Sequence, residues 1–138
     1  MPLPTYLEPE CRNGPPMPVA ILNGTADPVV PYAGGRVRVL GRARGEVMPT
    51  DATVALWRRR NGCGNAAKTE TIDPADDETV ITRTAYQGCA GAPVVLYRIE
   101  GGGHTWPGAR TYAPKAIVGP TSEDIDGAEE IWRFFAQF

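Results

Sequence analysis

The sequence has few of the side chains on which hydrolytic and metal chemistry most often depend. Its 138 residues include one histidine, His104, and one serine, Ser122. The three cysteines, Cys11, Cys63 and Cys89, stand apart rather than in Cys-x-x-Cys pairs, and with one histidine they do not give the ligand spacing of a structural zinc site. We therefore expect no metal ion and no other cofactor.

Excess charge and long apolar runs are also missing. Fourteen Lys and Arg residues against 16 Asp and Glu give a formal net charge of -2, which leaves no positive excess to attract nucleic acid or an anionic membrane. No apolar run approaches the roughly 18 residues of a membrane span, and the first residues lack the basic and apolar regions of a signal peptide. We predict no nucleic-acid partner, no membrane partner and no export signal in this sequence.

Glycine and proline are abundant, with 16 and 14 residues, and 42% of the residues are hydrophobic. This composition indicates one globular domain with many turns. Residues 1–17 contain proline-rich sequence without an apolar period, so we interpret them as a connector. Residues 18–138 are expected to form the folded domain.

Two short apolar runs are each followed by a residue with catalytic chemistry. Residues 19–22 (VAIL) predict a strand buried on both faces, and Asp27 follows at its carboxyl end, where open α/β sheets place catalytic groups. Residues 93–99 predict a second buried strand that leads through three glycines to His104. The alternatives are that Asp27 only makes an Asx-turn before Pro28, and that His104 is an incidental surface residue on a glycine turn.

Other elements are predicted from caps and periodicity. A helix is expected from Thr50 or Asp51 to Asn61-Gly62, with its three terminal arginines as a solvated helix end rather than a phosphate site. Residues 64–78 indicate a hairpin with an acidic tip that lacks EF-hand spacing, and residues 79–86 a strand. Residues 33–48 hold four glycines and four arginines without periodicity, so no element is assigned to them.

The last predicted helix starts after a capping sequence at residues 121–124 (TSED). Apolar residues recur at three- and four-residue intervals and predict a face turned toward the sheet. This face consists of Ile125, Ala128, Trp132 and Phe135, flanked by Ile131.

A disulfide between Cys63 and Cys89 would join the end of the first long helix to the end of the following strand. Closing a loop of about 26 residues would contribute on the order of 3 kcal/mol. Cys11 is then left without a partner in this sequence.

Asp27 and His104 fit two of the three roles in a hydrolytic triad. The aspartate orients the imidazole, which takes a proton from the nucleophile. In α/β-hydrolases the chain order is nucleophile, acid, histidine, so the nucleophile is expected before Asp27. Ser122 instead follows His104 and lacks a Gly-x-Ser-x-Gly elbow, and Cys63 and Cys89 both follow Asp27.

Several further motifs carry a family resemblance and occur in order along the chain. They are residues 24–32 (GTADPVVPY), Trp57 with Asn61-Gly62-Cys63, Tyr86 with Gly88-Cys89, residues 95–97 (VLY), residues 101–108 (GGGHTWPG) and residues 131–135 (IWRFF). From residue 18 to 138 this series resembles the C-terminal half of the polyhydroxybutyrate depolymerase and feruloyl or acetylxylan esterase group of secreted α/β-hydrolases.

The resemblance implies an α/β fold, the C-terminal part of an α/β-hydrolase with a mostly parallel sheet flanked by helices, incomplete without an N-terminal half. It implies a serine esterase with Asp27 as acid, His104 as general base, and Tyr32 and Trp106 as walls of the acyl pocket. The substrate would be a polyester or an aryl or acetyl ester of a plant polysaccharide, and the location secreted or periplasmic.

Three hypotheses follow. The first is that the chain is the C-terminal part of such an esterase, with little turnover by itself because the nucleophile is missing. The second is a non-catalytic module that keeps the aromatic pocket for a ligand, or a relic of the enzyme. The third is self-association through the open edge of an incomplete sheet.

Overall fold

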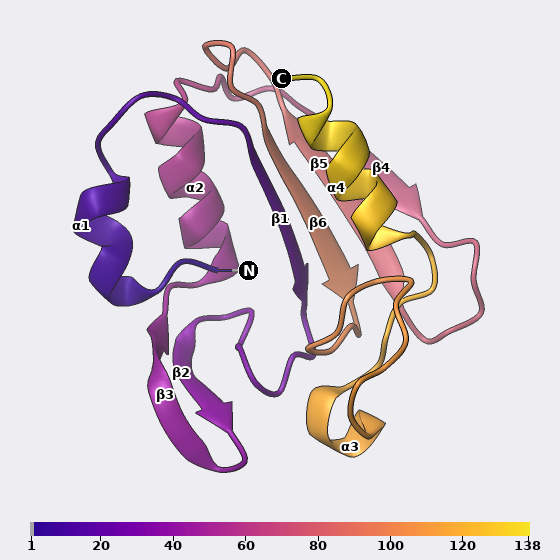
Figure 1. Ribbon diagram of the computed structural model, residues 1–138. Helices are drawn as coiled ribbons and strands as arrows, with labels where there is room; N and C mark the ends of the chain where they lie inside the picture. Colours follow the sequence, from indigo (N-terminus) through magenta and orange to yellow (C-terminus); the bar gives the residue numbers. More distant parts are fainter. Residues whose placement is uncertain (1) are drawn as a thin grey trace.

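The computed structural model describes residues 2–138 as a mixed α/β protein (Figure 1). The elements in chain order are η1 (Thr5–Leu7), α1 (Glu8–Cys11), β1 (Val19–Gly24), β2 (Gly35–Val39), β3 (Arg42–Val47), α2 (Thr50–Arg60), β4 (Ala67–Ile72), β5 (Val80–Tyr86), β6 (Val94–Glu100), α3 (Lys115–Val118) and α4 (Gly127–Phe135). Over these described residues, no helix has the length and apolar character needed to cross a membrane.

The main sheet has four strands in the order β1-β6-β5-β4. β1 and β6 are parallel, whereas β5 is antiparallel to both β6 and β4. The expectation of a mostly parallel sheet is therefore wrong for this chain. The reason is that β4, β5 and β6 follow one another through short loops, residues 73–79 and 87–93, and short loops join antiparallel neighbours.

Both faces of the sheet are covered, by helices on opposite sides. Successive residues of β6 point to opposite faces, so Leu96 packs with Val54 of α2 on one side, and Tyr97 packs with Phe134 of α4 on the other. Figure 1 shows α2 beside β1 and α4 beside β5. The long apolar run of β6, with only Arg98 exposed, follows from this two-sided burial.

The predicted long helix and the strands at residues 19–22, 79–86 and 93–99 are confirmed as α2, β1, β5 and β6, and the acidic hairpin tip joins β4 to β5. The last helix differs from its prediction. It begins at Gly127, because the Asp126 side chain accepts hydrogen bonds from the backbone N–H groups of Ala128 and Glu129.

Of the predicted inner face of the last helix, Ile125 packs against the core, but the assignment of Trp132 and Phe135 to that face is wrong. Phe134 is buried, whereas Trp132 is 73% exposed and Phe135 is 47% exposed. The inward side of the helix includes a charged residue, Glu130, which accepts a hydrogen bond from the Tyr97 hydroxyl at 2.8 Å. A prediction from apolar residues alone places Glu130 on the solvent side. The predicted helix is therefore rotated about its axis relative to the observed one.

The segment interpreted as a connector is docked on the domain, with residue 1 outside the described residues. Leu3 is buried; its N–H donates to Thr53 Oγ1 and its carbonyl accepts from Met48 N–H. The unassigned residues 33–48 form a two-stranded antiparallel ribbon of β2 and β3, separate from the main sheet.

Candidate active site

The loops that follow β1 and β6 are joined by backbone contacts at the carboxyl ends of these parallel strands. Thr25 N–H donates to Ile99 O at 2.9 Å, and Ala26 N–H donates to Gly102 O at 3.0 Å. A Cβ atom on Gly24 would lie 2.1 Å from Gly102 O, so only glycine permits this approach. Because each strand is followed by glycine and then by a loop, residues 25–27 lie against residues 101–104.

The histidine loop is also held from its other side. Gly103 N–H donates to Pro120 O, His104 N–H donates to Val118 O, and the Tyr112 hydroxyl donates to His104 O. A Cβ on Gly103 would lie 2.1 Å from Val118 O. The backbone of His104 is thus fixed by segments on both sides of the loop.

His104 Nδ1 lies 2.9 Å from Asp27 Oδ2. The other carboxylate oxygen, Oδ1, accepts hydrogen bonds from the N–H groups of Val29 and Val30, both at 2.8 Å. An ionised carboxylate can only accept a hydrogen bond, so with Asp27 ionised and the ring neutral this contact places the proton on Nδ1 and leaves the lone pair on Nε2. The Asx-turn considered as an alternative for Asp27 is real, and it orients the carboxylate that holds the imidazole.

The side chains of Asp27 and His104 differ in burial. The Asp27 side chain is 4% exposed, whereas the His104 side chain is 33% exposed. A buried, fully hydrogen-bonded acid behind a solvent-accessible imidazole is the arrangement that positions a general base.

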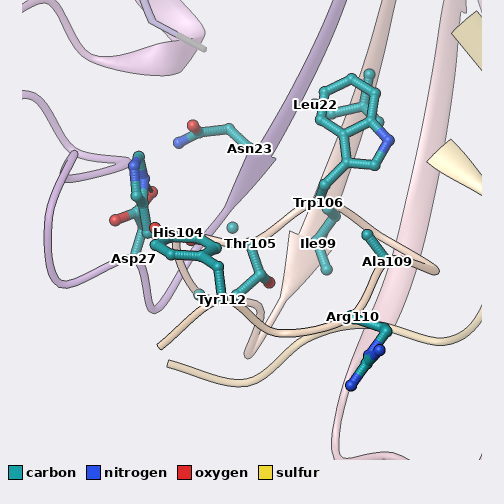
Figure 2. A pocket seen from close by; sticks show the side chains of 12 residues that line it. Leu22, Asn23, Asp27, Ile99, His104, Thr105, Trp106, Ala109, Arg110 and Tyr112 are labelled. Atoms are coloured by element: carbon teal, nitrogen blue, oxygen red, sulfur yellow. Dashed lines mark hydrogen bonds and ion pairs between the residues drawn. The ribbon is translucent and has the colours of Figure 1, made fainter. Parts of the chain in front are cut away.

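A pocket of about 370 Å³ opens beside this pair. Figure 2 shows Trp106 and the His104–Asp27 pair on opposite sides of it. The lining residues are Leu22, Asn23, Gly24, Asp27, Ile99, Gly103, His104, Thr105, Trp106, Ala109, Arg110 and Tyr112. The mixture of apolar walls and a few polar groups suits a small organic ligand.

Of the sequence-predicted site residues, the structure brings Asp27, His104 and Trp106 to this pocket, and it does not bring Tyr32 there. The Tyr32 hydroxyl donates to Asp51 Oδ1 at 2.8 Å, and its ring lies 5.3 Å from the Arg98 guanidinium carbon. Partial burial, together with the hydrogen bond to Asp51, raises the pKa of Tyr32 well above its usual value.

Within residues 2–138, no serine or cysteine lines the pocket. Ser122 is 2% exposed, and its hydroxyl donates to Asp124 Oδ2 at 3.1 Å. The Thr105 hydroxyl does line the pocket, but it donates to Pro120 O at 3.1 Å. Among the described residues, the pocket is therefore lined by the hydrogen-bonded pair of His104 and Asp27 but by no serine or cysteine side chain.

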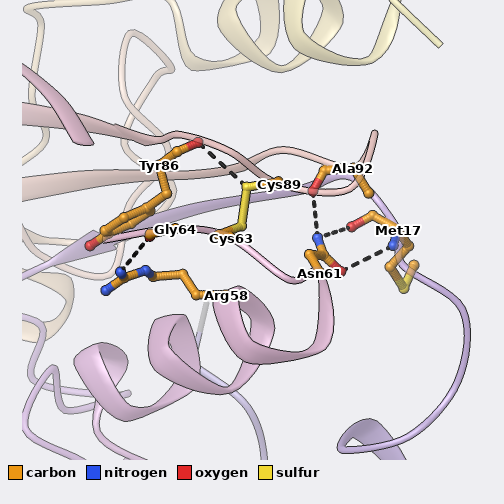
Figure 3. The surroundings of a disulfide bond; sticks show 8 residues. All are labelled: Met17, Arg58, Asn61, Cys63, Gly64, Tyr86, Cys89 and Ala92. Atoms are coloured by element: carbon orange, nitrogen blue, oxygen red, sulfur yellow. Dashed lines mark hydrogen bonds between the residues drawn. A yellow bond between two sulfur atoms is a disulfide. The ribbon is translucent and has the colours of Figure 1, made fainter. Parts of the chain in front are cut away.

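Cys63 and Cys89 form a disulfide, as expected from their positions. Figure 3 shows it linking the residues after α2 to the loop after β5. Next to it, the Asn61 amide donates to the carbonyls of Met17 and Ala92 and accepts from Met17 N–H. Cys11 is a free thiol.

Sequence reasoning missed much of the pocket wall. Asn23 is 5% exposed, and its amide donates to Thr50 Oγ1 at 3.2 Å. Its place as the next-to-last residue of β1 could have indicated it, because residues there lie at the ligand edge of the sheet. Arg110 and Tyr112 come from a long irregular loop, and no periodicity identifies them.

No described cluster of three or more His, Cys, Asp or Glu side chains within residues 2–138 could hold a metal ion. No protein-family model matches the chain, and no solved structure matches it. The chain is similar to a protein named "Putative esterase NocK" from Nocardia uniformis subsp. tsuyamanensis, with 30% identity in an alignment of 130 residues that covers 87% of this chain and 37% of that protein. The chain thus spans less than two fifths of the relative's length, and the similarity indicates an esterase relationship.

Proposed function

We propose that this chain supplies the acid and the general base of a serine-type carboxylic ester hydrolase. The observation that carries the proposal is the contact of 2.9 Å between His104 Nδ1 and Asp27 Oδ2 beside a pocket. A relative that is named as an esterase supports the same reaction class.

In the proposed reaction, His104 Nε2 accepts the proton of a serine hydroxyl while the serine oxygen attacks the ester carbonyl. Asp27 stays ionised, keeps Nδ1 protonated and stabilises the imidazolium. The imidazolium then gives its proton to the leaving alcohol, and a water molecule hydrolyses the acyl-enzyme by the same route.

The nucleophile is proposed to come from polypeptide other than these 138 residues. Ser122 is buried against Asp124 and does not line the pocket. The relative has most of its length outside the aligned region, which leaves room for a nucleophile elbow. The parallel pair β1 and β6, with the acid and the histidine in the loops after two neighbouring strands of the sheet, would then be the C-terminal part of an α/β-hydrolase sheet.

The substrate subgroup is proposed from the motif resemblance to polyhydroxybutyrate depolymerases and feruloyl or acetylxylan esterases. The pocket wall formed by Leu22, Ile99 and Trp106 is compatible with a short hydroxyalkanoate, an acetyl group or an aryl ring. A secreted or periplasmic location is supported by the Cys63–Cys89 disulfide, because such bonds persist in oxidising compartments.

The test compares two proteins: the whole reading frame that contains these residues, and the 138-residue chain alone. We expect the whole reading frame to hydrolyse p-nitrophenyl acetate and to be labelled on serine by a fluorophosphonate. Its His104→Ala variant should lose about 10⁶-fold in kcat. We expect the chain alone to be inactive and unlabelled. Turnover by the chain alone that depends on His104 would contradict the proposed external nucleophile.

A non-catalytic binding module is the second candidate. The observation that favours it is a pocket whose described lining includes no serine or cysteine. Trp106, which is 45% exposed, reports on this pocket. Saturable quenching of tryptophan fluorescence by ethyl ferulate or a hydroxybutyrate ester, absent in Trp106→Phe, would support this candidate if the whole reading frame shows no hydrolysis.

Self-association also stays a prediction. The outer strand β4 is exposed along most of its length and carries Lys68 and Glu70, charges that oppose strand pairing at that edge. Sedimentation of the chain at several concentrations distinguishes a monomer from an associating species.

A further inference from the structure

The β2–β3 ribbon concentrates positive charge that the whole-chain average conceals. It carries four arginines and one glutamate, a formal charge of +3, in a chain of formal charge -2, so the remaining residues carry -5. The four arginines are Arg36, Arg38, Arg42 and Arg44, and all four are exposed. The ribbon is therefore a cationic arm on an otherwise acidic protein.

The guanidinium groups of most of these arginines form no interaction within the described part of the protein. Arg36 forms an ion pair with Glu46 at 3.5 Å. Over residues 2–138, the guanidinium groups of Arg38, Arg42 and Arg44 have no ion pair, hydrogen bond or aromatic partner. These three groups are free to bind anionic groups outside the protein.

The tip of the ribbon is apolar and conformationally unfavourable. Leu40 is 82% exposed with φ 47°, and Gly41 follows with φ 77°, the two positive values of a type I′ hairpin turn. Asn or Gly suits the first of these positions, because the Cβ of other residues is strained there. Val39, beside the tip, is 40% exposed. An exposed leucine at a strained turn contributes no stabilising free energy in water. Its transfer from water into an apolar phase would be favourable.

The ribbon lies close to the candidate active site. Arg38 N–H donates to Val29 O at 3.0 Å, and Val29 N–H in turn donates to the Asp27 carboxylate. Figure 1 shows the ribbon at the end of the molecule to which β1 and β6 point. A surface that holds the ribbon would therefore lie near the loops of Asp27 and His104.

We propose that the β2–β3 ribbon docks the protein on an anionic lipid surface. Arg38, Arg42 and Arg44 bind the negatively charged headgroups, while Leu40 and Val39 enter the boundary between headgroups and acyl chains. A soluble polyanion would attract the arginines but would give no role to Leu40. This binding activity goes beyond the proposed ester hydrolysis and does not depend on it.

The experiment is vesicle flotation with the 138-residue chain. Vesicles of phosphatidylcholine with about one third phosphatidylserine are compared with vesicles of phosphatidylcholine alone. We expect binding to the anionic vesicles only, weakened by added salt. Arg38→Gln/Arg42→Gln/Arg44→Gln should weaken it by about 100-fold, at roughly five-fold per arginine.

Two single variants separate the contributions. Leu40→Asn removes the apolar tip while suiting the positive φ, so it should fold and yet bind about ten-fold more weakly. Arg59→Gln is the matched control, since Arg59 is exposed but lies on α2, and it should bind as the unmodified chain does. Circular dichroism verifies that each variant is folded.

Each other outcome overturns the proposal. These outcomes are no binding to anionic vesicles, equal binding to both vesicle types, or binding that survives the triple substitution. If heparin competes and Leu40→Asn changes nothing, the ribbon is a site for soluble polyanions and not for lipid. No readout requires turnover, so failure here is distinct from failure of the esterase proposal.

Discussion

The loops of Asp27 and His104 and the β2–β3 ribbon lie at the same end of the molecule but are held in opposite ways. The two loops are bound to each other and to residues 118–120 by backbone hydrogen bonds, and glycines there leave no room for a side chain. Most residues of the ribbon are exposed, apart from the buried Val47 at its base and the half-buried Val37. Cβ atoms at Gly35, Gly41 and Gly45 would meet nothing within 4 Å. The two loops are held in place by the protein, as the proposed catalytic roles require, whereas the ribbon is accessible to an external surface.

The largest expected effect is on the fixed region. In the whole reading frame, Asp27→Asn should lower kcat for p-nitrophenyl acetate by about 10⁴-fold, because an amide no longer holds Nδ1 protonated. Tyr32→Phe serves as the control and should change kcat little, since Tyr32 hydrogen-bonds Asp51 away from the pocket. Equal losses in both variants would mean that the Asp27 contact has no special role.

A pair of glycine substitutions compares the two regions directly. Gly24→Ala places a Cβ 2.1 Å from Gly102 O, whereas Gly41→Ala meets only the strain of φ 77° in open space. We expect a loss of about 3 kcal/mol or more in the free energy of unfolding for Gly24→Ala, against about 1 kcal/mol for Gly41→Ala. Urea unfolding measures both. Similar losses would contradict the close approach of the two loops.

Leu40→Asn should stabilise the protein by about 1 kcal/mol, because Asn tolerates positive φ and loses no packing at this exposed position. Together with weaker vesicle binding, such a gain would mean that Leu40 serves binding at the expense of folding. A destabilised variant would instead indicate that Leu40 packs against the protein. Thermal unfolding followed by circular dichroism provides the measurement.

The smallest effect concerns the acidic tip of the β4–β5 hairpin, which is joined to residues 122–124. Burial raises the pKa of Asp77, but hydrogen bonds from the Thr79 hydroxyl and from the N–H groups of Glu123 and Thr79 outweigh it, so the pKa is lowered. A depressed pKa gives stability above the unfolded value of about 4, and this stability is lost as the pH falls through the folded value. Asp77→Asn should therefore be less stable than the unmodified chain at neutral pH, and the difference should shrink in acid. A constant difference across a pH series of urea unfolding curves would contradict this.

Much of the site could be predicted because its residues follow buried strands. Asp27 and His104 lie in the loops that follow β1 and β6, the two most apolar runs, and parallel neighbours bring such loops together. Tyr112, Val118 and Pro120, which hold the histidine loop, come from a segment without periodicity, so nothing local indicates them.

The remaining errors have physical causes. Short loops reverse the direction of β5, and Glu130 occupies the inner side of α4 because Tyr97 donates to it. The ribbon could not be predicted from periodicity, because its strands lack a continuous buried apolar face. Its positive charge is hidden in the net charge of the whole chain, which is -2. The absence of excess charge in a sequence therefore does not exclude a local charged surface.

The most direct test of the central claim is nitrogen-15 NMR of the imidazole, which is unambiguous because His104 is the only histidine. At a pH where the ring is neutral, we predict that Nδ1 carries the proton, that this proton is shifted downfield by its bond to Asp27, and that Asp27→Asn removes the shift. A proton on Nε2, or a spectrum unchanged by Asp27→Asn, would contradict the assignment of these two residues as acid and base.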